Sequence, residues 1–154
     1  MTVTGEIDLF SHTINPILGL LALGLPITKR YRDFMINRRY YTALTFAVLL
    51  AYCWMHFERE YRWWEQLWGV TFSTHTAVHV AILSALWQLS VRWRLASVFI
   101  GAAYALLMVV RHYHAPSDIG LTAVSLLPEL AAIWWLAQAR RAAPRPPQAA
   151  SPVG

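Results

Sequence analysis

Long apolar runs alternate with short polar segments along the whole chain. A helix rises 1.5 Å per residue and a bilayer core is ~30 Å thick, so about 20 apolar residues suffice for one crossing. Runs near that size cover residues 11–28, 41–57, 72–91, 95–110 and 118–139. The pattern predicts an all-α integral membrane protein, a bundle of about five transmembrane helices.

Two segments break this alternation. Residues 58–70 mix glutamates, arginines and tryptophans, which is typical of a short amphipathic helix lying on the bilayer surface. Residues 140–154 are rich in alanine and proline, which predicts a disordered tail. We therefore expect one transmembrane domain over residues 1–139, followed by a tail over residues 140–154.

Composition supports the membrane prediction and excludes other classes. With 57% hydrophobic and only 14% charged residues, the chain is too apolar for an ordinary soluble domain of its length. The net charge of +5 is then a topology signal, and we expect no nucleic-acid partner. The single cysteine, Cys53, excludes an intrachain disulfide.

Basic residues mark alternate ends of the predicted helices. They concentrate in residues 29–39, in the expected turn at residues 92–94 and at Arg140 and Arg141, whereas the N-terminus is acidic. By the positive-inside rule these basic segments are cytoplasmic. The prediction is a bacterial-type inner (plasma) membrane protein with its N-terminus outside and its C-terminus in the cytoplasm.

The six histidines all fall near the opposite, extracytoplasmic ends of the runs; they are His12, His56, His75, His79, His112 and His114. Histidines that merely pack between helices have no reason to choose one side. Any one of them alone is most simply an interfacial residue with a satisfied hydrogen bond. The six together favour a shared functional site.

The segment 111–118 is the richest in chemistry. The spacing from His114 to Asp118 across a Pro-Ser turn can place a carboxylate beside an imidazole, which fixes the tautomer and stabilises the imidazolium. A simpler interpretation is two interfacial histidines followed by a helix cap, with Ser117 or Asp118 as the N-cap.

The third apolar run opens on Ser73-Thr74-His75-Thr76. Free N–H groups in a first helical turn can receive an anion, and His75 would stand at its edge. Simple N-capping is the alternative for Ser73 and Thr74. His75, His114 and Asp118 could then act as acid, nucleophile and orienting carboxylate.

These residues resemble a known family. Ser73-Thr74-His75-Thr76 resembles the Ser-Gly-His-Thr motif of the type 2 phosphatidic acid phosphatase superfamily, and the segment from His114 to Asp118 resembles its His-Tyr-Pro-Ser-Asp motif. The pattern His112-x-His114-x-x-x-Asp118 is closer to the sphingomyelin synthase branch, with its His-x-His-Tyr-x-x-Asp. The resemblance covers residues 72–124 and keeps the order of the motifs.

The resemblance implies a membrane lipid phosphatase or phosphotransferase that acts at the extracytoplasmic face on a phospholipid or other lipid phosphate and needs no cofactor. His114 would attack the phosphorus and become a transient phosphohistidine, which Asp118 would orient. His75 would protonate the leaving alkoxide and then activate the accepting water or alcohol.

The chain also departs from the superfamily pattern. The Lys-x-x-x-x-x-x-Arg-Pro motif is absent, Met108 stands where an arginine is usual, and Thr74 replaces a glycine. Five predicted spans replace the usual six. The remaining candidates for substrate binding are Arg59, Arg62, Arg111, His112, Glu58, Glu60, Ser73 and Thr74.

Two alternatives stay open. The first is a metal-dependent membrane enzyme or metal carrier, since imidazole and carboxylate ligands suit Zn, Fe or Cu. Its candidate ligands are His56, Glu60, His75, His79, His112 and His114. The second is a non-catalytic membrane subunit with interfacial histidines. A homo-oligomer is compatible with each of these hypotheses.

Glu129 falls near the middle of the fifth run, directly after Pro128. A carboxylate within the membrane is costly and is a functional candidate by default. It lies ~16 Å along the helix from Asp118, too far for direct chemistry. We expect Glu129 to be hydrogen-bonded to a neighbouring helix, and Pro128 to kink its own helix.

Overall fold

The structure is a computed structural model that describes residues 3–28 and 38–139, with side chains placed for residues 13–28 and 38–138. Every regular element in these ranges is helical. The elements are α1 (Val3–Gly24), the 3₁₀ turn η1 (Leu25–Ile27), α3 (Arg38–Tyr61), α4 (Trp63–Trp68), α5 (Thr74–Trp87), α6 (Val91–Val110) and α7 (Pro116–Ala139). The predicted all-α class is confirmed for this part of the chain.

Among the described residues, three helices are long and apolar enough to cross a membrane. They are α3, α6 and the α7 segment Pro116–Gln138. Such helices fit an integral membrane protein. The apolar stretch Thr13–Ile27, which comprises the end of α1 and η1, and the 14-residue α5 are shorter, so a crossing at these two places stays a prediction.

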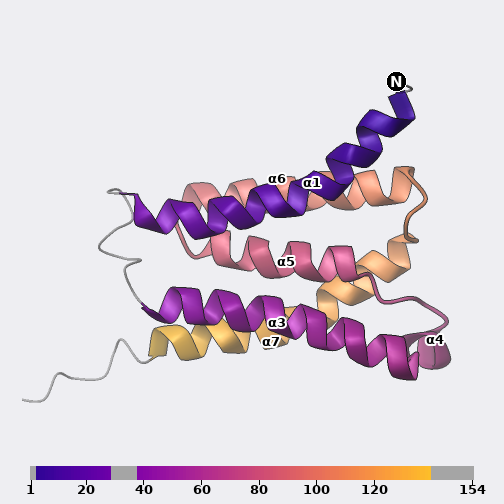
Figure 1. Ribbon diagram of the computed structural model, residues 1–154. Helices are drawn as coiled ribbons and strands as arrows, with labels where there is room; N and C mark the ends of the chain where they lie inside the picture. Colours follow the sequence, from indigo (N-terminus) through magenta and orange to yellow (C-terminus); the bar gives the residue numbers. More distant parts are fainter. Residues whose placement is uncertain (1–2, 29–37, 140–154) are drawn as a thin grey trace, which may run out of the picture.

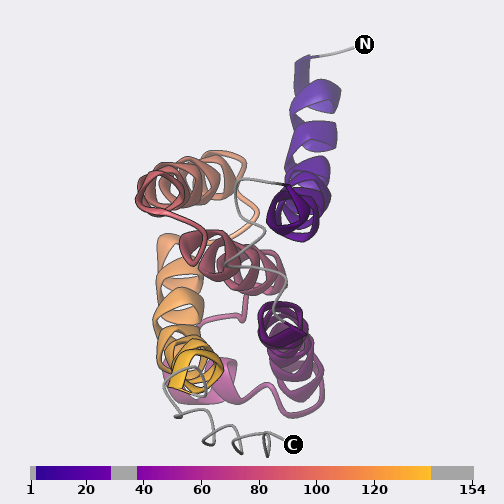
Figure 2. The same cartoon turned by 90° about the vertical axis from the view of Figure 1, so that its left-hand side faces the viewer.

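The helices form an up-and-down bundle with α5 at its centre. In Figure 1, α1, α5 and α7 run in one direction and α3 and α6 in the other. The end-on view in Figure 2 shows α5 surrounded by α1, α3, α6 and α7, and α5 contacts each of them. α5 can hold this place because Ala77, Ala81 and Ala85 are buried and let the neighbouring backbones approach closely.

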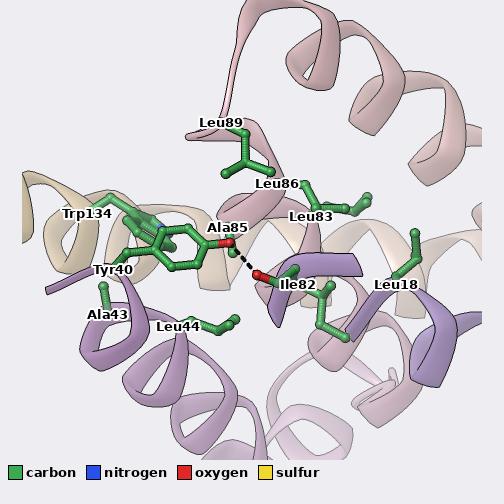
Figure 3. Close-up of a cluster of buried hydrophobic side chains, with 11 residues drawn as sticks. Leu18, Tyr40, Ala43, Leu44, Ile82, Leu83, Ala85, Leu86, Leu89 and Trp134 are labelled. Atoms are coloured by element: carbon green, nitrogen blue, oxygen red, sulfur yellow. Dashed lines mark hydrogen bonds between the residues drawn. The ribbon is translucent and has the colours of Figure 1, made fainter. Parts of the chain in front are cut away.

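A core cluster joins α1, α3, α5 and α7 (Figure 3). The hydroxyl of the buried Tyr40 donates to the Ala22 carbonyl on α1 at 3.0 Å, and its ring lies 5.6 Å from that of Trp134 on α7. The outer surface is also apolar: Leu20, Phe99 and Trp135 are each about 70% exposed. An exterior of this kind is suited to lipid rather than to water.

Two helix boundaries differ from the sequence prediction. The turn expected at residues 92–94 belongs to α6, because Ser90 caps that helix by accepting a hydrogen bond from the Trp93 N–H. Likewise α7 begins at Pro116, a residue suited to a first helical position. Ser117 and Asp118 therefore lie inside the helix, and the prediction that one of them is the N-cap was wrong.

The predicted short helix within residues 58–70 is confirmed as α4. It begins after Arg62, whose backbone is left-handed with φ 48°, and ends at Gly69 with φ 64°. Both carboxylate oxygens of Glu58 accept the Trp64 N–H, at 3.0 and 3.2 Å, which satisfies a free donor of the first turn. Residues 29–37 of the basic segment 29–39, the tail 140–154 and the side chain of His12 lie outside the described residues.

Candidate functional site

The candidate histidines gather at one end of the bundle. The end of α3, the beginning of α5, the end of α6 and the beginning of α7 all lie on the right of Figure 1. His56, His75, His112 and His114 belong to these helix ends, and His79 lies one turn deeper in α5. The up-and-down order of the helices therefore places these five histidines at the same end of the bundle.

Asp118 joins the two motif segments. Its carboxylate accepts hydrogen bonds from the Thr71 N–H and the Thr71 hydroxyl, both at 3.0 Å, and from the Ala115 N–H at 3.2 Å. We call this group of Thr71, Ala115 and Asp118 the Asp118 clamp. Because Thr71 precedes α5 and Ala115 precedes α7, the clamp ties together the beginnings of these two helices.

A second bond continues this attachment. The Ser73 N–H donates to the Thr122 hydroxyl on α7 at 3.0 Å. Ser73 is fully buried, and its hydroxyl accepts from the Thr76 N–H at 3.3 Å, so it caps α5. The N-capping interpretation of Ser73 is therefore confirmed, whereas its role in substrate binding stays a prediction.

His114 lies beside Asp118, as its spacing predicts. Its Nδ1 is 3.7 Å from Asp118 Oδ2, with the side chains 19% and 12% exposed. This separation is longer than a hydrogen bond and short enough for attraction between an imidazolium and a carboxylate. Asp118 thus lies where it can stabilise a positive charge on His114, while its strongest contacts hold the clamp.

His75 lies in the first turn of α5, and its side chain is exposed. Its backbone carbonyl accepts a hydrogen bond from Asn15 Nδ2 on α1 at 3.3 Å. The first turn of α5 is therefore attached to α7 through Ser73 and to α1 through Asn15. An exposed imidazole on such an anchored turn can exchange protons with a bound substrate.

A groove of about 310 Å³ opens at the same end. Its lining comes from the end of α3, from residues in and just before α4, and from residues 71–74, which lead into α5: Met55, Glu58, Arg59, Arg62, Glu65, Thr71, Phe72 and Thr74. Thr71 and Thr74 connect this groove to the clamp and to the turn that carries His75. The groove is close to the lower limit of typical small-ligand sites.

The two arginines of the groove differ in their partners. Arg62 forms a two-pronged pair with Glu65, from Nε at 2.8 Å and from Nη2 at 2.6 Å. Within residues 13–28 and 38–138, no carboxylate pairs with Arg59, which is exposed. Arg59 is therefore the better candidate for an anionic ligand, and Glu60 is exposed beside it.

The end of α6 carries the remaining candidates. The His112 N–H bonds the Val109 carbonyl and the Tyr113 N–H bonds that of Met108, both at 3.0 Å. These two backbone hydrogen bonds form a Schellman motif, with His112 in the left-handed position (φ 55°) where glycine is usual. His112 is exposed and Arg111 is half-buried, whereas Met108 is 2% exposed and packs with Tyr104 and Ile119.

The ligands proposed for a metal do not converge in the described ranges. No group of three or more His, Cys, Asp or Glu side chains there could hold a metal ion. His56 and Glu60 are exposed on α3, while His79 is 2% exposed and bonded to Asn15. The geometry therefore gives the metal alternative no support from these residues.

Sequence reasoning missed two polar partners. Asn15, a polar residue in the first apolar run, bonds His79 and Tyr104, and its position before Pro16 was the available signal. Thr71 holds Asp118, and nothing in the local sequence marks it. For Glu129, by contrast, the predicted hydrogen bond to a neighbouring helix is confirmed. Its partner is Trp54 on α3, whose Nε1 donates to Glu129 Oε2 at 2.9 Å.

Comparison with known proteins adds no relative. No protein-family model, no curated protein and no solved structure matches the chain.

Proposed function

We propose that this protein is a membrane enzyme that removes a phosphate group from a lipid, or transfers it to an alcohol, through a phosphohistidine formed on His114. One observation carries the proposal. The carboxylate of Asp118 contacts the His114 ring and, through Thr71, holds the segment leading to His75. A further bond joins Ser73 to Thr122, 49 residues along the chain, so the segments that carry the two motifs are attached to each other where they begin.

The chemistry follows from the positions of the two ring nitrogens of His114. Nδ1 faces Asp118, so Nε2 is the atom available to attack phosphorus. As the N–P bond forms and the P–O bond to the lipid alcohol breaks, His75 gives its proton to the leaving oxygen. Neutral His75 then takes a proton from water or an alcohol, whose oxygen attacks phosphorus and releases His114.

The groove supplies the anion-binding part of the proposal. Phosphoryl transfer depends on cations that neutralise the equatorial oxygens and on precise positioning. Arg59 lines the groove without a carboxylate partner among the described residues, and Arg's planar fork suits phosphate. In this proposal the bundle crosses the bilayer five times, with this end on the extracytoplasmic face of an inner membrane.

The decisive experiment is a panel of lipid phosphates and phosphodiesters incubated with detergent-purified protein, with and without EDTA. We expect chelator-resistant turnover that falls at least a hundredfold in His114→Ala and Asp118→Asn. His56→Ala changes an exposed histidine at the same end outside the proposed mechanism, and should retain full turnover.

Two results would contradict the proposal. Full turnover in His114→Ala would exclude the phosphohistidine. Loss of turnover in EDTA together with loss in His56→Ala would favour the metal alternative instead. Trapping of an acid-labile phosphate on a peptide that contains residue 114 would support the covalent step directly.

A further inference from the structure

A polar cluster of three side chains lies inside the bundle, close to the first turn of α5. Asn15 on α1, His79 on α5 and Tyr104 on α6 form it, and we call it the Asn15 cluster. Asn15 Oδ1 is 2.7 Å from His79 Nδ1, and Asn15 Nδ2 donates to the Tyr104 hydroxyl at 3.4 Å. The rings of His79 and Tyr104 stack 3.9 Å apart at 10°, and each residue is 2% exposed.

The hydrogen-bond pattern fixes the orientation of the Asn15 amide. Its Nδ2 donates to the His75 carbonyl at 3.3 Å as well as to Tyr104, so its Oδ1 must be the acceptor that faces His79. His79 then carries its proton on Nδ1. The stacked ring of Tyr104 keeps the His79 imidazole from rotating, and His79 in turn keeps the amide aimed at His75.

The position of this bond matters for the site. Ser73 attaches the beginning of α5 to α7, on one side, and Asn15 attaches the His75 backbone to α1, on the other. Asn15 directly precedes Pro16, which removes one backbone donor from α1 and allows the helix to bend there. Figure 1 shows the first turns of α1 leaning away from the bundle. Asn15 is thus the contact by which α1 can act on His75.

We infer that Asn15 is a positioning residue for His75, held in place by His79 and Tyr104. The inference rests on the proposed function, in which His75 moves the proton of the leaving and attacking oxygens. An error of about 1 Å in the placement of such a group can cost about a hundredfold in rate. The Asn15 cluster would therefore affect turnover without contacting the substrate.

The test compares Asn15→Asp with Ser84→Ala in the full-length, detergent-purified protein. Asn15→Asp keeps an oxygen that can accept from His79 but loses the amide donor to the His75 carbonyl and to the Tyr104 hydroxyl. Ser84→Ala removes one side-chain bond between α5 and α7, the 2.9 Å bond from Trp134 Nε1, far from His75. A second variant, Asn15→Ser, is too short to reach the His75 carbonyl and guards against misfolding of the first.

We expect both Asn15 variants to lower kcat about tenfold or more, with KM within twofold, and to shift the limb of the pH–rate profile that reports His75. Ser84→Ala should leave kcat, KM and the pH profile unchanged. A general loosening of α5 would instead reduce activity in all three variants without moving the pH profile, which would overturn the inference.

A second measurement separates this inference from the proposed function. Diethyl pyrocarbonate modifies exposed imidazoles, and peptide mass spectrometry gives the rate at His75 without any substrate. We expect Asn15→Asp to change this rate at least threefold and Ser84→Ala to leave it unchanged. An inactive wild-type protein would refute the proposed function. An unchanged His75 rate in both folded Asn15 variants would refute the positioning role.

Discussion

The Asp118 clamp and the Asn15 cluster lie near the same end of the bundle and are built on opposite principles. The clamp uses a charged acceptor and donors from an exposed residue, Thr71, and from the backbone of Ala115. The Asn15 cluster contains no carboxylate, and its His79 and Tyr104 are almost fully buried. Water can replace a broken bond in the clamp but cannot easily enter the cluster.

Because of this difference, we expect the two regions to contribute unequally to the free energy of unfolding and to turnover. A buried polar group left without its partner costs its full desolvation free energy, whereas an exposed one is rescued by water. The Asn15 cluster should therefore contribute more to the free energy of unfolding. The clamp, which contacts His114, should contribute more to turnover under the proposed function.

The largest expected loss of stability follows from His79→Leu. Leucine fills much of the ring volume but offers no donor to Asn15 and no stacking on Tyr104. We expect the free energy of unfolding to fall by about 2–3 kcal/mol. Denaturation in mixed micelles, followed by tryptophan fluorescence, measures this change. His56→Leu, on the exposed face of α3, is the control and should change it by less than about 0.5 kcal/mol.

A smaller loss is expected for Asp118→Ala. Three hydrogen bonds disappear, but Thr71 is exposed and water can satisfy its donors. We expect a decrease of about 1–2 kcal/mol in the same unfolding experiment, with about half of that in Asp118→Asn, which keeps one acceptor oxygen. A loss greater than that of His79→Leu would reverse the ranking of the two regions.

The smallest effect should have the opposite sign. His112 occupies the left-handed position of the Schellman motif at φ 55°, which costs a residue with a Cβ about 1 kcal/mol. His112→Gly removes this strain but adds freedom to the unfolded chain, so we expect a gain of a few tenths of a kcal/mol. Tyr113→Gly, just beyond that position, should not stabilise. A loss of stability in His112→Gly would show that the His112 side chain makes a contact of its own.

Much of the fold could be read from local pattern. Most observed helix ends lie within a few residues of the ends of the apolar runs. The reason is that an apolar stretch in lipid can satisfy its backbone hydrogen bonds only as a helix. The first helix is the exception, since α1 extends back to Val3, beyond the apolar run. The errors at α6 and α7 arose at the first turns of these helices. Ser90 caps α6 and Pro116 is the first residue of α7, so both helices begin before their apolar runs do.

The candidate site was predictable only in part. The spacing of His114 and Asp118 correctly indicated that they are neighbours, since both lie around one short turn. The role of Glu58 was not predictable, because its carboxylate caps α4, six residues further along. The catalytic assignment of His75, His114 and Asp118 stays a prediction that the experiments above decide.

By itself the sequence determined a helical protein with an apolar exterior and its histidines at one end, because both properties follow from residue type and from the direction of each helix. Only the tertiary structure decided which polar groups meet. Thr71 and Asp118 are 47 residues apart, and Asn15 lies 64 and 89 residues from His79 and Tyr104. Such pairs depend on how each helix is rotated against its neighbours, and a buried polar group has no water to offer it another partner.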